Sequence, residues 1–212
     1  MWWAFSMWSE ALPLAAGVLA RARLTSTRVW IMFWSAVYLI MNLSAKYLAE
    51  HHLNNHFLSY IALPVQAFAV LWALALWQER PTARLTLRLA IPAILIAFAF
   101  TMTLDDIRSF SAVSEPVYSI VALGAAIFTL LTRSQHEIAP LMQQDWFWVC
   151  AGLILHFGAL AVLTPFASYY VTREPQLVFQ AYNVRAVINT VGFILIAAGV
   201  YSPSSPRSGP SS

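Results

Sequence analysis

Residues 57–77 read FLSYIALPVQAFAVLWALALW, a run of 21 residues without a charged side chain. A helix needs about 20 predominantly apolar residues to cross the hydrocarbon core of a bilayer. The run is long and continuous, whereas strands of a membrane β-barrel alternate in character over segments of about ten residues. This segment is therefore expected to be a membrane-spanning helix.

Six further apolar segments flank this one. Since connections in helical bundles are about 2–8 residues long, seven such units fill the chain. The sequence predicts an all-α integral membrane bundle of seven transmembrane helices over residues 1–201. The Pro/Ser/Gly-rich residues 202–212 are expected to form a disordered cytoplasmic tail. The six further segments are approximately residues 2–20, 29–49, 87–104, 116–132, 146–168 and 177–201.

The composition excludes several classes of protein. Hydrophobic residues make up 60% of the chain and charged residues 10%, whereas an ordinary soluble domain carries about 25% charged residues. The single cysteine, Cys150, excludes an internal disulfide and a cysteine-based zinc site. The basic residues lie between apolar segments instead of forming one patch, so the expected partner is the lipid bilayer and not nucleic acid.

The basic residues also indicate an orientation, because cytoplasmic loops carry an excess of Lys and Arg. Lys46, Arg108 and Arg173 lie on the side of the second, fourth and sixth connections. More basic residues lie on the other side, so we expect the N-terminus outside and the C-terminus in the cytoplasm, with the protein in a bacterial inner membrane. That larger set is Arg21, Arg23, Arg28, Arg80, Arg84, Arg88, Arg133 and Arg207.

Polar side chains occur at similar depth in several segments. Ionisable residues within membrane segments are costly and usually face the interior of the bundle. These side chains either form hydrogen bonds that hold the helices together or line an outward-facing pocket for an unknown small molecule, and the sequence leaves both interpretations open. The candidate pocket residues are Glu10, Asn42, Gln66, His156, Tyr182, Arg185 and Asn189.

Arg185 is the most informative of these residues. It lies about 10 Å inside the last segment at 1.5 Å per residue, so its guanidinium needs a counter-ion or water. Glu10 is the expected partner, with Asp105 or Asp106 as alternatives.

No cofactor, metal or catalytic signature is expected. His51, His52 and His56 carry imidazoles that suit a transition metal, but neither HExxH nor a Cys/His finger spacing is present. A b-type haem would need a second histidine deep in a segment besides His156. The absence of GxSxG, P-loop and GxGxxG motifs makes an enzyme the less favoured interpretation.

Two resemblances follow from short motifs. Leu12-Pro13-Leu14, Asn54-Asn55 and Phe147-Trp148 resemble a family of bacterial seven-span proteins that carries no assigned activity. The segment count and orientation resemble the SWEET sugar transporters, as does the spacing shared by residues 57–60 and 179–182, although Pro64-Val65-Gln66 departs from the Pro-Gln dipeptide of that family.

These observations favour a membrane protein that binds a small molecule, like a receptor or sensor. A transporter of small solutes is the alternative. A lipid-modifying enzyme using His156 and Glu10, or a structural subunit associated with other membrane chains, comes third.

Overall fold

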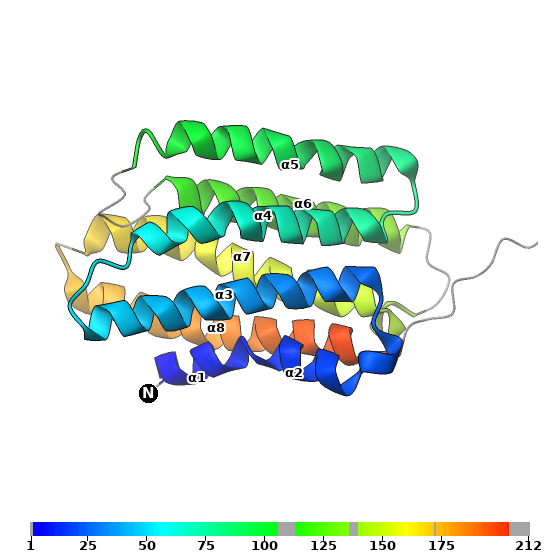
Figure 1. The fold of residues 1–212 in the computed structure, drawn as a ribbon, viewed down its shortest axis with the longest axis horizontal. Helices are drawn as coiled ribbons and strands as arrows, with labels where there is room; N and C mark the ends of the chain where they lie inside the picture. The colour runs from blue at the N-terminus through cyan, green and yellow to red at the C-terminus, as the bar shows by residue number, and fades with distance from the viewer. Residues whose placement is uncertain (1, 106–112, 136–139, 172, 204–212) are drawn as a thin grey trace, which may run out of the picture.

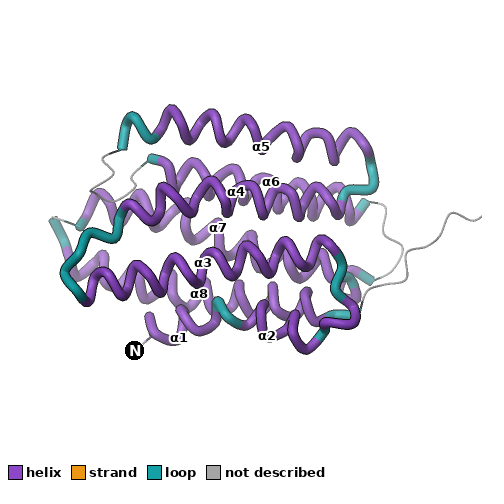
Figure 2. The backbone as a smooth tube through the Cα atoms, viewed as in Figure 1, coloured by secondary structure: helices purple, strands orange, loops and turns teal. Residues whose placement is uncertain are grey.

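The computed structural model describes residues 2–105, 113–135, 140–171 and 173–203 (Figure 1). These residues form helices and no strand (Figure 2). Two short 3-10 turns, Arg21–Arg23 and Leu141–Gln143, lie in connections. The α-helices are α1 (Trp2–Ser9), α2 (Leu12–Leu19), α3 (Ser26–Glu50), α4 (Phe57–Trp77), α5 (Pro81–Thr101), α6 (Ser114–Ser134), α7 (Asp145–Tyr170) and α8 (Pro175–Tyr201).

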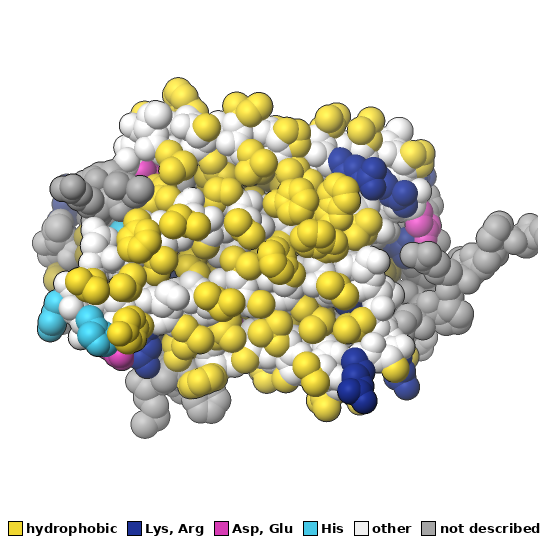
Figure 3. Space-filling model, viewed as in Figure 1, with side chains coloured by type: hydrophobic (Ala, Val, Ile, Leu, Met, Phe, Trp, Pro, Cys, Tyr) yellow, Lys and Arg dark blue, Asp and Glu magenta, His cyan; other side chains and the backbone are white. Residues whose placement is uncertain are grey.

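Within the described residues, six helices, α3 to α8, are long and apolar enough to cross a membrane. Hydrophobic side chains cover the middle of the face seen in Figure 3, whereas the charged side chains and histidines on that face gather toward the two ends. The chain is therefore an all-α bundle of the kind found in multi-pass membrane proteins. Of the residues named above, Asp106, Arg108 and Arg207 lie outside the described part of the chain.

The first predicted segment differs from the other six. It runs along the bundle as two eight-residue helices, α1 and α2, interrupted at Glu10 and Ala11 (Figure 1). Pro13 explains the interruption, because a proline ring clashes with the carbonyl four residues earlier, here that of Ser9. The expectation of one continuous helix over residues 2–20 was wrong, and no helix in this stretch is long enough to cross a membrane by itself.

Successive long helices run in opposite directions (Figures 1 and 2). We call the end where α1 begins the N-terminal end; the α3–α4 and α7–α8 connections lie there too. At the opposite end lie the α2–α3, α4–α5 and α6–α7 connections and the last turn of α8.

Helices α7 and α8 form the closest contact in the bundle. A Cβ atom added at Gly152 would lie 2.4 Å from the carbonyl oxygen of Gly192, and one added at Gly199 would lie 2.7 Å from that of Asp145. Small residues at such positions let helix backbones approach closely in a membrane. Helix α5 lies at the periphery, where exposed side chains such as Ile96 and Phe100 suit contact with lipid.

Capping residues set several helix ends beyond the predicted boundaries. Thr25 accepts a hydrogen bond from the backbone N–H of Arg28 at 3.4 Å, so α3 starts three residues before residue 29. Both carboxylate oxygens of Asp105 accept backbone N–H groups, of Val113 at 3.1 Å and Ser114 at 2.9 Å. Asp105 therefore caps α6 and is not a partner of Arg185 in any described ion pair.

Candidate functional site: a polar cavity at the N-terminal end

A cavity of about 550 Å³ lies between the α1–α2 segment, α3 and α8. Its volume falls within the range of small-molecule sites, about 300–1,000 Å³. Ten of its fourteen lining residues are polar. The cavity therefore brings polar side chains together with apolar lining from Met7 and three alanines.

Glu10 lines the cavity at the interruption between α1 and α2. Its side-chain oxygens accept hydrogen bonds from Asn42 Nδ2 at 2.8 and 2.9 Å, and the residue is only 4% exposed. The Ser35 hydroxyl donates to the Glu10 carbonyl oxygen at 2.6 Å. Two residues of α3 thus fix both the backbone and the carboxyl group of Glu10.

Arg185 lines the cavity from α8 and pairs with a residue that the sequence did not indicate. Its Nη2 lies 3.7 Å from Glu115 Oε1 in the first turn of α6, and it donates to the Tyr38 hydroxyl at 3.5 Å. The predicted Glu10–Arg185 pair was wrong. The predicted segment began at residue 116, but α6 begins at Ser114 and so includes Glu115. In the first turn of α6, the carboxylate of Glu115 lies near Arg185.

His156 and Asn189 join α7 to α8. His156 Nδ1 lies 3.1 Å from Asn189 Oδ1, and the imidazole is fully buried. Aromatic rings enclose it, with centroids 5.4 Å away for Trp34, 5.0 Å for Tyr38 and 5.3 Å for Phe193. Its Nε2 atom has no hydrogen-bond partner in the described part of the chain.

The structure thus places five of the seven candidate pocket residues at the cavity: Glu10, Asn42, Tyr182, Arg185 and Asn189. The other two candidates are not among the lining residues. His156 lies in the aromatic enclosure, and Gln66 is buried on α4 with its Nε2 3.6 Å from Met41 Sδ.

Further lining residues were not among the candidates. Tyr38 and Lys46 lie four residues on either side of Asn42, so helical spacing gave a signal for both. Glu50 follows Lys46 by four residues at the end of α3, so the same spacing applies to it. Asn55 gave no signal, because it lies in the α3–α4 connection that folds back to the cavity. Asn55 Nδ2 donates to the Ala45 carbonyl oxygen at 3.0 Å and holds that connection against α3.

The remaining candidates do not form a reactive cluster. His51 Nδ1 lies 2.8 Å from the Tyr47 carbonyl oxygen, and no group of three or more His, Cys, Asp or Glu side chains in the described residues is arranged to hold a metal ion. His156 and Glu10, the acid–base pair that a lipid-modifying enzyme would use, make separate hydrogen bonds to Asn189 and Asn42.

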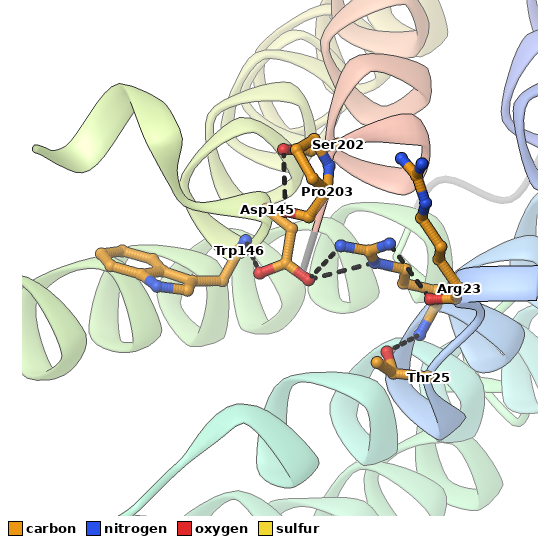
Figure 4. A network of polar contacts seen from close by, with 7 residues as sticks. Arg23, Thr25, Asp145, Trp146, Ser202 and Pro203 are labelled. Carbon is orange, nitrogen blue, oxygen red and sulfur yellow. Dashed lines mark hydrogen bonds and ion pairs between the residues drawn. The ribbon is translucent and has the colours of Figure 1, made fainter. Parts of the chain in front are cut away.

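A buried ion pair closes the opposite end of the bundle (Figure 4). Arg28 is fully buried, and its Nε and Nη2 donate to Asp145 Oδ2 at 3.1 and 2.9 Å. Its Nη1 donates to the Arg23 carbonyl oxygen, while Asp145 Oδ1 accepts the backbone N–H of Trp146. The sequence placed Arg28 in a loop, since residue 28 precedes the apolar run, and therefore gave no sign of this pair.

Comparisons of the chain with models of protein families, with curated proteins and with solved structures gave no match. Function is therefore inferred from the residues of this chain alone.

Proposed function

We propose that this multi-pass membrane protein binds a small polar molecule in the cavity, as a receptor or sensor does. The cavity itself carries the proposal: about 550 Å³ lined mostly by polar side chains, in a chain that is 60% hydrophobic. Polar lining side chains contact one another across helices, as Asn42 does with Glu10 and Arg185 does with Tyr38, yet a space of small-molecule size remains between them. Buried polar groups in a membrane are costly and commonly mark functional sites.

We also propose that the α1–α2 segment completes a seven-segment bundle and that the N-terminal end faces outward. Residues 2–19 would extend about 27 Å as helix at 1.5 Å per residue, close to the ~30 Å hydrocarbon core. Among the described basic residues, Lys46 and Arg173 lie toward the N-terminal end, and Arg185 lies within α8 at the cavity. The arginines toward the opposite end, which the positive-inside rule assigns to the cytoplasm, are Arg21, Arg23, Arg28, Arg80, Arg84, Arg88 and Arg133.

Mass spectrometry of co-purifying molecules tests the binding proposal. The protein is purified in mild detergent, extracted, and compared with the Ala45→Phe variant, whose ring would fill space at the cavity wall. Ile40→Phe is the matched control, because Ile40 is on the same helix with 62% exposure at the lipid-facing surface. A small molecule retained by the wild type and the control but absent from Ala45→Phe supports the proposal. Identical extracts from all three proteins contradict it.

Transport of a small solute is the second candidate, and the interruption of the first segment favours it. Secondary transporters commonly place substrate and coupling-ion sites at discontinuous helices, and Glu10 lies at such a discontinuity beside the cavity. The Arg28–Asp145 pair would then close the cytoplasmic side while the cavity is open to the outside. Uptake of the identified molecule into proteoliposomes separates a transporter from a receptor, which binds without flux.

A further inference from the structure

Four charged side chains line the cavity, those of Glu10, Lys46, Glu50 and Arg185. Lys46 Nζ lies 3.7 Å from Glu50 Oε1, and Arg185 Nη2 lies 3.7 Å from Glu115 Oε1. Glu10 makes no ion pair with any described residue and has only the neutral Asn42 amide on its carboxyl oxygens. Glu115 pairs with Arg185 but is not itself a lining residue, so the lining holds two acidic and two basic side chains. Glu10 is the one of these four that makes no ion pair with a described residue.

Glu10 lies between two helix ends, since α1 ends at Ser9 and α2 begins at Leu12. The partial negative charge at the end of α1 and the partial positive charge at the start of α2 oppose each other there. A buried carboxylate is costly unless it is paired or protonated. The cavity that Glu10 lines gives a positively charged group room to approach it.

Other acceptor groups line the same space. The phenol groups of Tyr38 and Tyr182 and the side-chain amide of Asn55 can accept hydrogen bonds from an N–H donor. A cationic ligand with further N–H or O–H groups would therefore find both a charge partner and neutral partners in the cavity.

We propose that the cavity binds a small organic ammonium compound whose positively charged nitrogen contacts the Glu10 carboxylate. This inference rests on the proposed function and adds the chemical class of the ligand. A hydrogen bond to a charged group is worth about 1.5–3 kcal/mol, which corresponds to roughly 10- to 150-fold in affinity.

Thermal unfolding of the purified protein in detergent, with added probes, tests the proposal. The probes are ethanolamine, 1,4-diaminobutane and tyramine, each compared with the neutral alcohol in which a hydroxyl replaces every amino group, at matched sodium chloride. A ligand that binds only the folded state raises the melting temperature in a saturable way. We expect at least one amine to do so while its alcohol counterpart does not.

Three variants assign the effect to Glu10. Glu10→Gln keeps the size and an acceptor oxygen for Asn42, and it should weaken amine binding at least tenfold. Glu10→Asp keeps the charge and should retain binding better than Glu10→Gln. Glu79→Gln removes a carboxylate that pairs with Arg133 at the opposite end of the bundle and does not line the cavity, so it should change affinity less than threefold. Far-ultraviolet circular dichroism and the melting temperature without ligand verify that each variant folds.

Several outcomes overturn the inference. Equal affinity of an amine for the wild type and Glu10→Gln, equal effects of amine and alcohol, or no effect of any amine would each do so; the last is expected if Glu10 simply holds a proton. If mass spectrometry finds a neutral or anionic molecule that Ala45→Phe loses, the binding proposal stands and the ammonium inference falls. If nothing is retained and no probe binds, both fall.

Discussion

Replacing Gly152 by alanine should destabilise the bundle by forcing α7 and α8 apart. The added Cβ would lie 2.4 Å from the Gly192 carbonyl oxygen, 2.6 Å from Ile196 Cγ1 and 3.0 Å from the Ile196 backbone nitrogen. Ordinary contacts begin at 3.4 Å, so the backbones must separate by about 1 Å. Overpacking of this kind costs about 1–3 kcal/mol. The helix propensity of alanine over glycine offsets about 1 kcal/mol of that cost, so we expect a net loss of up to about 2 kcal/mol.

Gly158→Ala on the same helix is the matched control, because a Cβ there would meet nothing within 4 Å. It should leave stability unchanged or raise it by up to about 1 kcal/mol through helix propensity. Reversible unfolding in mixed detergent micelles measures both free energies of unfolding. Gly152→Ala should be less stable than Gly158→Ala by about 1–3 kcal/mol, and equal changes in the two variants would refute the close packing of α7 against α8. Because α8 carries Arg185 and Asn189, Gly152→Ala should also reduce retention of the cavity's ligand.

Three further predictions concern other polar contacts, each measured as a free energy of unfolding in the same micelles. Asp145→Asn leaves the buried Arg28 charge without its partner and should cost about 3 kcal/mol. The control is Glu79→Gln, which removes the 70% exposed partner of Arg133 and should cost less than about 1 kcal/mol. Equal losses of stability in the two variants would contradict this prediction. Asn189→Leu removes the partner of His156 Nδ1 and should cost about 1–3 kcal/mol, so an unchanged stability would argue against that bond. Asp105→Ala removes the N-terminal cap of α6 and should cost about 1 kcal/mol, and a gain in stability would show that the cap does not form.

The fold class followed from the sequence because long apolar runs have few alternatives to membrane helices. Six of the seven predicted segments correspond to helices α3–α8, and their boundaries shift where a cap or proline sets the end, as Thr25 and Pro81 do. The first segment is a different case. Its composition is that of a span, yet Pro13 divides it at Glu10, and hydropathy does not register the backbone clash.

The polar contacts were predictable only in part. Helical spacing predicted interior-facing positions for four residues, and all four line one cavity. They are Glu10, Asn42, Arg185 and Asn189. Their pairing depends on how neighbouring helices are offset along the bundle, which one sequence does not specify. Arg185 therefore pairs with Glu115 from α6, and Arg28 pairs with Asp145 across 117 residues of chain.

Labelling of an introduced cysteine tests most directly whether a polar cavity opens at the outer face of the membrane. Ala45→Cys would place a thiol on the cavity wall, whereas the native Cys150 is fully buried and should contribute little background. A membrane-impermeant maleimide added to intact cells should label Ala45→Cys, and Arg21→Cys at the opposite end should be labelled only after permeabilisation. Labelling of Arg21→Cys but not Ala45→Cys in intact cells would reverse the orientation, and failure to label Ala45→Cys under either condition would contradict an open cavity.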